Sequence, residues 1–318
     1  MHIPDGFLDA KTAVATTALS AAGLGYALRR ARRELPPRRV PLLGLSAAFL
    51  FAAQMVNFPV AGGTSGHLLG AALVAALLGP CAAVVVMATV LIVQCFLFAD
   101  GGMLALGANI FNMGLVGTVG GYGVYQLVQS ILPGFRGRVA ALAFAGWCST
   151  VLASISCAGE LAWSGTVAWG IGFPAMAGVH MLIGTGEGLI SALVFAAVAR
   201  TRPDLLSAAS PGDAAPRLRG FVVLGLLATL GIALFVAPFA RPWPDGLERV
   251  ATTLGFRGRA AAPLLQAPAA NYQVSGMGPS VMATAAAGCI GAVAAFCLAV
   301  ALSRLLVRTQ DDAGNLRA

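Results

Sequence analysis

The first two residues, Met1 and His2, contain the atoms of a metal chelate. The α-amine, the backbone nitrogen of His2 and its imidazole Nδ1 can bind one ion together and close a five- and a six-membered ring. Three nitrogens in a plane leave one position open, and a square-planar set of nitrogens selects Ni(II) or Cu(II), whereas Zn(II) prefers a tetrahedron. Pro4 has no backbone N–H, so the chelate should not extend along the chain. The alternative is a disordered terminus in which His2 has no role.

A second histidine, His67, follows a glycine-rich stretch at 61–66 and precedes an apolar run. It is therefore expected at the start of a helix, on the same side of the membrane as the N-terminus. From there its imidazole can supply a fourth nitrogen to the ion. The alternative is a structural histidine at a helix start or at the membrane interface.

Two further pairs of polar residues lie in apolar segments. His180 and Glu187 are seven residues apart and so share one face of a helix, and an ionisable group in a membrane span faces the protein interior. They can support the metal ligands from behind or form a step in ion passage; the alternative is a buried polar tie between helices. Asn109 and Asn112 can hydrogen-bond the metal-binding loop, or the glycines around them can simply pack helices closely.

Motifs for several enzyme classes are missing. Lys11 is the single lysine and no glycine precedes it, so the chain has no P-loop and does not hydrolyse nucleotide by that route. It also has no HExxH motif of an intramembrane metalloenzyme. The six cysteines are scattered in apolar runs without a CxxC pair, which is typical of small hydrophobic residues rather than of a zinc site.

The composition is that of an integral membrane protein. Of 318 residues, 58% are hydrophobic and only 10% are charged, and the mean hydropathy is +0.84. Soluble domains carry roughly 25% charged residues, and disordered chains are far less apolar. Both classes are therefore excluded.

Nine apolar runs approach the roughly 20 residues that a membrane-spanning helix needs. We predict spans at 11–29, 40–57, 67–79, 80–99, 107–132, 139–157, 174–199, 220–237 and 281–302. The third is short and is separated from the fourth only by Gly79-Pro80, which predicts a tight hairpin. The predicted fold class is an all-α integral membrane protein.

The basic residues predict the orientation. Fifteen of the twenty lie in connections on one side of the predicted spans, which places the N-terminus outside and the C-terminus in the cytoplasm. The net charge of +8 is then a topology signal, with anionic lipid headgroups as neighbours, and not a nucleic-acid footprint. The first ten residues carry Asp5 and Asp9 and no basic residue, so they are not a secretory signal.

A polar, Pro/Ala-rich stretch at 201–219 divides the chain. We predict a seven-helix domain at 1–200, a cytoplasmic linker at 201–219 and a two-helix domain at 220–318. The last encloses an external segment at 238–280, in which Trp243-Pro-Asp-Gly-Leu-Glu248 predicts a turn.

Several of these motifs resemble a known family. Met-His-Ile-Pro-Asp-Gly-Phe-Leu at the start, Gly66-His67, the run at 109–114 and His180 with Gly186-Glu187-Gly188 are similar to the substrate-binding membrane component of nickel/cobalt energy-coupling-factor (ECF) transporters, the CbiM/NikM type. Residues 244–248 resemble the PDGLE domain, a two-span NikN/CbiN-like companion often fused behind it. Together the two resemblances cover nearly the whole chain.

The resemblance implies a transporter subunit of a prokaryotic cell membrane rather than an enzyme. In that family the transported Ni(II) or Co(II) is held by the amine of Met1, the amide and imidazole nitrogens of His2, and the imidazole of His67. The partners are a transmembrane coupling protein and cytoplasmic ABC ATPases, which agrees with the missing P-loop. Ala48 and Ala52, four residues apart, are the expected contact with the coupling protein.

Two other functions stay open. A secondary metal/proton transporter would need several intramembrane carboxylates, of which Glu187 is the only clear one. A structural subunit without a ligand would require the pairing of His2 with His67 to be chance. The resemblance does not separate nickel from cobalt, although a planar nitrogen set favours nickel.

Overall fold

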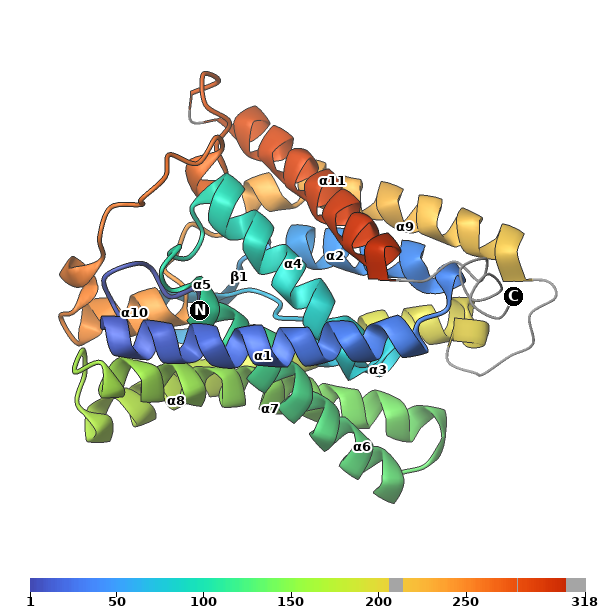
Figure 1. Cartoon of the computed structure of the whole chain (residues 1–318), viewed down its shortest axis with the longest axis horizontal. Helices are drawn as coiled ribbons and strands as arrows, with labels where there is room; N and C mark the ends of the chain where they lie inside the picture. The colour runs from blue at the N-terminus through green and yellow to red at the C-terminus, as the bar shows by residue number, and fades with distance from the viewer. Residues whose placement is uncertain (206–213, 279, 307–318) are drawn as a thin grey trace, which may run out of the picture.

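The computed structural model describes residues 1–205, 214–278 and 280–306 (Figure 1). The described chain is mostly helical. Its α-helices are α1 (Ala10–Glu34), α2 (Val40–Gln54), α3 (Ala71–Leu78), α4 (Pro80–Phe98), α5 (Leu106–Asn109), α6 (Gly121–Ile131), α7 (Gly134–Trp163), α8 (Trp169–Thr201), α9 (Ala214–Phe235), α10 (Gly246–Thr253) and α11 (Val281–Leu306). Strands β1 (Phe58–Val60) and β2 (Thr64–Gly66) form an antiparallel hairpin. Part of the predicted linker, 206–213, lies outside the described residues.

Five helices of the described chain are long and apolar enough to cross a membrane: α4, α7, α8, α9 and α11. The protein is thus a multi-pass membrane protein, in agreement with its composition. The predicted division into seven and two spans is not confirmed by these five and stays a prediction.

Two of the other predicted spans are shorter than expected. At about 1.5 Å per residue, the 15 residues of α2 fall short of the roughly 30 Å of hydrocarbon. The prediction for 67–79 is wrong at its start, because β2 and a left-handed Gly70 (φ 73°) precede α3, which has only 8 residues. Gly79, also at positive φ, separates α3 from α4 as predicted.

The predicted span at 107–132 is a continuous helical stretch with an unusual centre. Between α5 and α6, residues Ile110–Gly120 form a π-helix, a rare conformation that is frequent at functional sites. Small residues let this stretch approach its neighbours: a Cβ on Gly121 would lie 2.9 Å from Ser149 Cβ and 3.0 Å from Ala72 Cβ.

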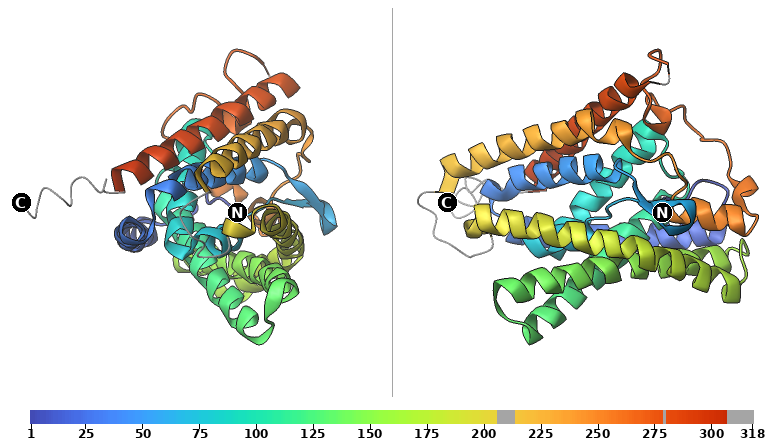
Figure 2. Two further views of the ribbon diagram at one scale, coloured as in Figure 1. Left: turned by 90° about the vertical axis from the view of Figure 1, so that its right-hand side faces the viewer. Right: turned by 180° about the vertical axis from the view of Figure 1, so that it is seen from behind.

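The helices form layers (Figures 1 and 2). Helices α6, α7 and α8 lie on one side, α9 and α11 lie on the other, and α1 to α4 lie between them. Helix α11 packs closely on α2, since a Cβ on Gly291 would lie 2.0 Å from the ring of Phe51 and a Cβ on Gly44 would lie 2.6 Å from Val300. Ala48 and Ala52 of α2 are fully buried. The C-terminal helices are therefore an integral part of the packing around α2.

Candidate metal centre

The N-terminal segment is buried and held by specific hydrogen bonds. Ile3 is fully buried, and both its backbone N–H and its carbonyl bond the side chain of Asn109, at 2.8 and 3.1 Å. The carboxylate of Asp5 accepts from the backbone N–H groups of residues 103–105, at 3.1, 2.9 and 3.3 Å. Charge-assisted bonds of this kind are strong. Asn109 thus lies where its amide fixes the start of the chain.

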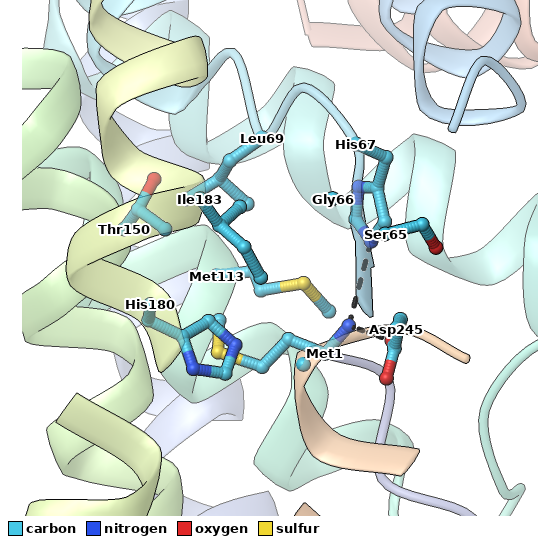
Figure 3. Close-up of a pocket in the computed structure, with 11 residues that line it drawn as sticks. Met1, Ser65, Gly66, His67, Leu69, Met113, Thr150, His180, Ile183 and Asp245 are labelled. Atoms are coloured by element: carbon cyan, nitrogen blue, oxygen red, sulfur yellow. Dashed lines mark hydrogen bonds and ion pairs between the residues drawn. The ribbon is translucent and has the colours of Figure 1, made fainter. Parts of the chain in front are cut away.

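The three predicted ligands lie together. The amine of Met1 is 3.4 Å from Nε2 of His67 and forms an ion pair with the carboxylate of Asp245 (Figure 3). The rings of His2 and His67 are stacked, with centroids 5.7 Å apart. His67 comes from the loop after β2, so a glycine-rich hairpin carries it to the terminus.

The spacing suits a bound ion. With metal–nitrogen bonds of about 2.0–2.1 Å, two nitrogens on one ion lie about 2.9 Å apart when adjacent and about 4.1 Å apart when opposite. The observed 3.4 Å between the Met1 amine and His67 Nε2 exceeds the adjacent value by about 0.5 Å, so the two nitrogens must move slightly closer to share a planar ion. The adjoining cavity has a volume of about 20 Å³, which is enough for one water molecule or an ion of similar size.

A metal site in this cluster would have to use main-chain nitrogens. Within the described residues no group of three His, Cys, Asp or Glu side chains could hold a metal. The terminal amine of Met1 and Nε2 of His67 approach each other instead, and the ring of His2 stacks on His67 with its Nδ1 facing Asp100. A site of this kind exists only if the amine is at the chain start.

The sequence did not indicate the role of Asp245. Its carboxylate caps α10 by accepting from the backbone N–H of Glu248 at 2.8 Å. The side-chain carboxylate of Glu248 in turn accepts from the backbone N–H of Asp245. The Asp-x-x-Glu spacing of this capping box was a readable signal for a helix start, and the predicted turn is in fact that start. No local signal could show that the other carboxylate oxygen meets Met1.

Residues 243–248 lie between strand β2, which leads to His67, and helix α8, which carries His180. The carbonyls of Trp243 and Pro244 accept from the hydroxyl and the N–H of Ser65, at 2.7 and 2.9 Å. Gly246 lies against His180, because a Cβ there would be 2.7 Å from His180 Nε2. His180 lines the cavity and bonds the carbonyl of Met176 through Nδ1 at 2.8 Å.

Glu187 and Asn112 have different partners. Glu187 is fully buried and accepts from the N–H groups of Leu69 and Gly70, at 2.5 and 2.8 Å, so it holds the loop that carries His67. Asn112 donates to the buried carboxyl of Glu160 at 2.7 Å, a partner that the sequence did not indicate.

Electrostatics favour lone pairs on the imidazoles and a proton on the amine. Burial lowers the pKa of His67 well below its ordinary value, and the nearby amine lowers it further. Burial also lowers the pKa of His2, with Asp100 partly offsetting the effect. For the Met1 amine, burial lowers the pKa, but the charge and hydrogen bond of Asp245, together with Asp100 and Cys157, raise it by more, so the net shift is upward. A metal ion that binds the amine would have to displace its proton.

The fold and this cluster define a class: a multi-pass helical membrane protein with a candidate metal site at its buried N-terminus. Residues 2–205 match the family model CbiM, described as a cobalt uptake substrate-specific transmembrane region, and residues 219–308 match the PDGLE domain. The chain therefore belongs to the CbiM family, with a PDGLE domain fused behind, as the resemblance implied.

Similar proteins carry transport names. The "Putative fused nickel transport protein NikMN" of Archaeoglobus fulgidus is 38% identical over 96% of this chain and 98% of its own length. The "Fused nickel transport protein NikMN" of Rhodobacter capsulatus is 34% identical over 72% of this chain and 71% of its own. A crystal structure of a truncated transition metal transporter superposes with a TM-score of 0.58 at 32% identity, over 63% of this chain and 99% of that one. These relatives are metal transport proteins, consistent with a non-enzymatic transporter subunit.

Proposed function

We propose that this chain captures Ni(II) or Co(II) on the outside of the cell as the substrate-binding component of an ECF-type importer. The ligands are the amine of Met1, the amide nitrogen and Nδ1 of His2, and Nε2 of His67. The observation that carries the proposal is the 3.4 Å approach of the Met1 amine to His67 Nε2, next to the stacked His2 ring. The nickel and cobalt transport names of relatives support the choice of metals.

Binding proceeds by replacement of protons. The ion takes the place of the proton on the Met1 amine, and Asp245 loses its direct partner. Coordination by the amide nitrogen of His2 releases a second proton, so affinity falls with acidity. Four nitrogens around the ion suit the planar geometry that Ni(II) accepts.

The C-terminal region acts on both ends of the chelate. Asp245 holds the amine directly. At the other end, the hydroxyl of Tyr272 donates to Asp100 at 2.5 Å, and Asp100 lies 3.3 Å from Nδ1 of His2. Tyr272 and Asp245 both come from the predicted external segment. The PDGLE domain therefore assists the loading of the ion.

We place the N-terminus outside and the C-terminus in the cytoplasm, with seven spans in 1–200 and two in 220–318. The arrangement supports this: the ends of α1, α8 and α11 and the starts of α2 and α9 point to one side, away from α10 and the N-terminus (Figure 1). Arginines cluster at these ends, as in the last turns of α1, α8 and α11. Anionic headgroups of the cytoplasmic leaflet are their neighbours.

The proposed partners are a transmembrane coupling protein and cytoplasmic ABC ATPases. Ala48 and Ala52 stay the proposed contact, with one condition. Both are fully buried on a helix that packs against α9 and α11. A coupling protein can reach them only after a helix that packs on α2 moves away.

The central test is nickel binding by the purified full chain, measured by calorimetry, with uptake in cells that contain the partner proteins. His2→Ala and a variant extended by two residues before Met1 should each lose at least tenfold in affinity. Tyr26→Phe, an exposed change on α1, is the control. Unchanged binding in both variants would exclude the N-terminal site, and uptake that persists without the ATPases would favour a secondary transporter.

A further inference from the structure

We propose that a relay of two buried glutamine side chains sets the tautomer of His2, so that Nδ1 presents its lone pair to the ion. Gln94 and Gln54 are then positioning residues for the metal site. The inference rests on the proposed function for its purpose, but it concerns the metal-free protein and is tested there.

The relay runs from a backbone carbonyl to the imidazole. The carbonyl of Leu69 accepts from Nε2 of Gln54 at 3.1 Å. Oε1 of Gln54 accepts from Nε2 of Gln94 at 2.7 Å. Oε1 of Gln94 then faces Nε2 of His2 at 3.0 Å. The three contacts join the loop before α3, the end of α2, the C-terminal part of α4 and the N-terminus.

The donor and acceptor of every hydrogen bond in the relay follow from the group at its start, the backbone carbonyl of Leu69. A backbone carbonyl only accepts, so the amide nitrogen of Gln54 must point at Leu69. The side-chain oxygen of Gln54 then faces Gln94, so Gln94 must donate to it from its amide nitrogen. The oxygen of Gln94 is left for His2, and Nε2 of His2 must carry the hydrogen. In the neutral ring the other nitrogen, Nδ1, is then unprotonated.

Burial gives the relay its strength. Gln54 is 5% exposed and Gln94 is not exposed at all, so no bulk water can pair with a reversed amide. Reversal of either amide would set two acceptors or two donors against each other, which is costly in a buried site.

The loop that carries the Leu69 carbonyl, where the relay starts, is held in place by Glu187. The N–H of Leu69 and that of Gly70 bond the carboxylate of Glu187, while the Leu69 carbonyl serves Gln54. Because His67 lies two residues before Leu69, this one loop places His67 directly and sets the His2 tautomer through the relay.

The relay acts against a competing group. Asp100 lies 3.3 Å from Nδ1 of His2, and a carboxylate favours a hydrogen on the nitrogen that faces it. Without the relay the hydrogen would move to Nδ1, the nitrogen that closes the six-membered chelate ring with the amide. That tautomer cannot bind the ion until the hydrogen leaves.

The test is ¹⁵N NMR of the histidine-labelled, metal-free full chain at mildly alkaline pH, where the ¹⁵N shifts distinguish protonated from unprotonated ring nitrogens. His2→Ala assigns the His2 signals. We expect hydrogen on Nε2 in the parent protein and on Nδ1 in Gln94→Met, which removes the acceptor at similar volume. Gln94→Glu keeps an acceptor for His2, although it loses the donor to Gln54, and should keep hydrogen on Nε2. Thr89→Val, an equally buried change on α4 that only removes a bond to Val85, should change nothing.

Nickel affinity should follow the tautomer. A 10- to 100-fold loss is expected for Gln94→Met, the usual effect of removing a group that orients a metal ligand, with recovery in Gln94→Glu. If Gln94→Met does not fold, Gln54→Leu replaces it, since release of the Gln94 amide should give a mixture of tautomers. Hydrogen on Nδ1 in the parent protein, or the same tautomer in Gln94→Met and the parent, overturns the proposal.

The outcomes separate this inference from the proposed function. If the parent shows hydrogen on Nε2 but binds no nickel through Met1 and His2, the relay stands and the proposed function falls. If it binds nickel there while its metal-free His2 has hydrogen on Nδ1, the metal site stands and the relay falls.

Discussion

The carboxylate of Asp245 forms a partly buried ion pair with the amino group of Met1, across 244 positions of sequence. The PDGLE region therefore touches the atom that opens the proposed chelate. Before an ion arrives, Asp245 gives the amine a partner and keeps the N-terminus in the bundle. The same contact stabilises the proton on the amine, and this proton competes with the metal ion for the amine nitrogen.

We expect nickel affinity to fall as the pH falls, because the ion must displace the proton of the Met1 amine. Burial lowers the pKa of this amine, but Asp245, with smaller contributions from Asp100 and Cys157, raises it by more, so the pKa of the amine lies above its ordinary value. Asp245→Asn removes the largest upward contribution to this pKa, and the loss of affinity should then begin at a lower pH. Calorimetric titrations across pH measure both profiles. Asp9→Asn, at the exposed start of α1, is the control, and identical profiles for Asp245→Asn and the parent would refute the role of Asp245.

Glu187→Ala should destabilise the protein and weaken nickel binding. The change leaves the buried N–H groups of Leu69 and Gly70 without their acceptor, at about 1–3 kcal/mol each. The free energy of unfolding in detergent measures this loss, and Glu187→Gln, which keeps one oxygen, should lie between. Glu34→Ala breaks only an exposed pair with Arg30 and should change stability by no more than about 1 kcal/mol. Equal stability of Glu187→Ala and Glu34→Ala would contradict the assignment.

The parts of the site that the sequence predicted are the local ones. Met1 and His2 are adjacent, so their chelate follows from covalent geometry, and His67 is marked by its glycine-rich approach. The structure brings all three together, while their role as ligands stays a prediction. The apolar runs located the helices, but not the late start of α3, because strand β2 and the left-handed Gly70 are set by packing.

The residues that sequence reasoning missed act across long separations. Tyr272 reaches Asp100 over 172 positions, and Gln94 reaches His2 over 92. Periodicity and turn residues report on neighbours along the chain, so they carry no information on which loop closes over which helix. Ala48 and Ala52 illustrate the same limit, since their small size indicates a close contact without naming the helix that makes it.

Gly246→Ala should destabilise the closed site by overpacking. The new methyl group would lie 2.6 Å from Cε1 of His180, and such crowding costs about 1–3 kcal/mol. In a His180→Ala background the penalty should shrink, so a double-mutant cycle should give a clear coupling energy. Gly258→Ala, where an added Cβ meets nothing within 4 Å, is the matched control. Additive effects of the two changes would show that α10 does not press on His180.

Tyr272→Phe keeps the packing of the Tyr272 ring but removes its hydrogen bond to Asp100, which lies beside His2. The ring should keep its stacking on Phe98 (centroids 5.0 Å apart), while Asp100 loses its donor. A hydrogen bond to a charged group contributes about 1.5–3 kcal/mol, and we expect the lower end because Asp100 is 28% exposed.

Nickel affinity should also fall several-fold in Tyr272→Phe, because an Asp100 carboxylate without this donor is a stronger acceptor for a hydrogen on Nδ1 of His2. Thermal unfolding and calorimetry on the same preparations measure the two effects, with Tyr26→Phe, which is 66% exposed, as the control. A loss of stability with unchanged affinity would mean that the external segment only packs on the bundle. A loss of both would mean that it also orients the chelate, and only the second result supports a loading role for the PDGLE domain.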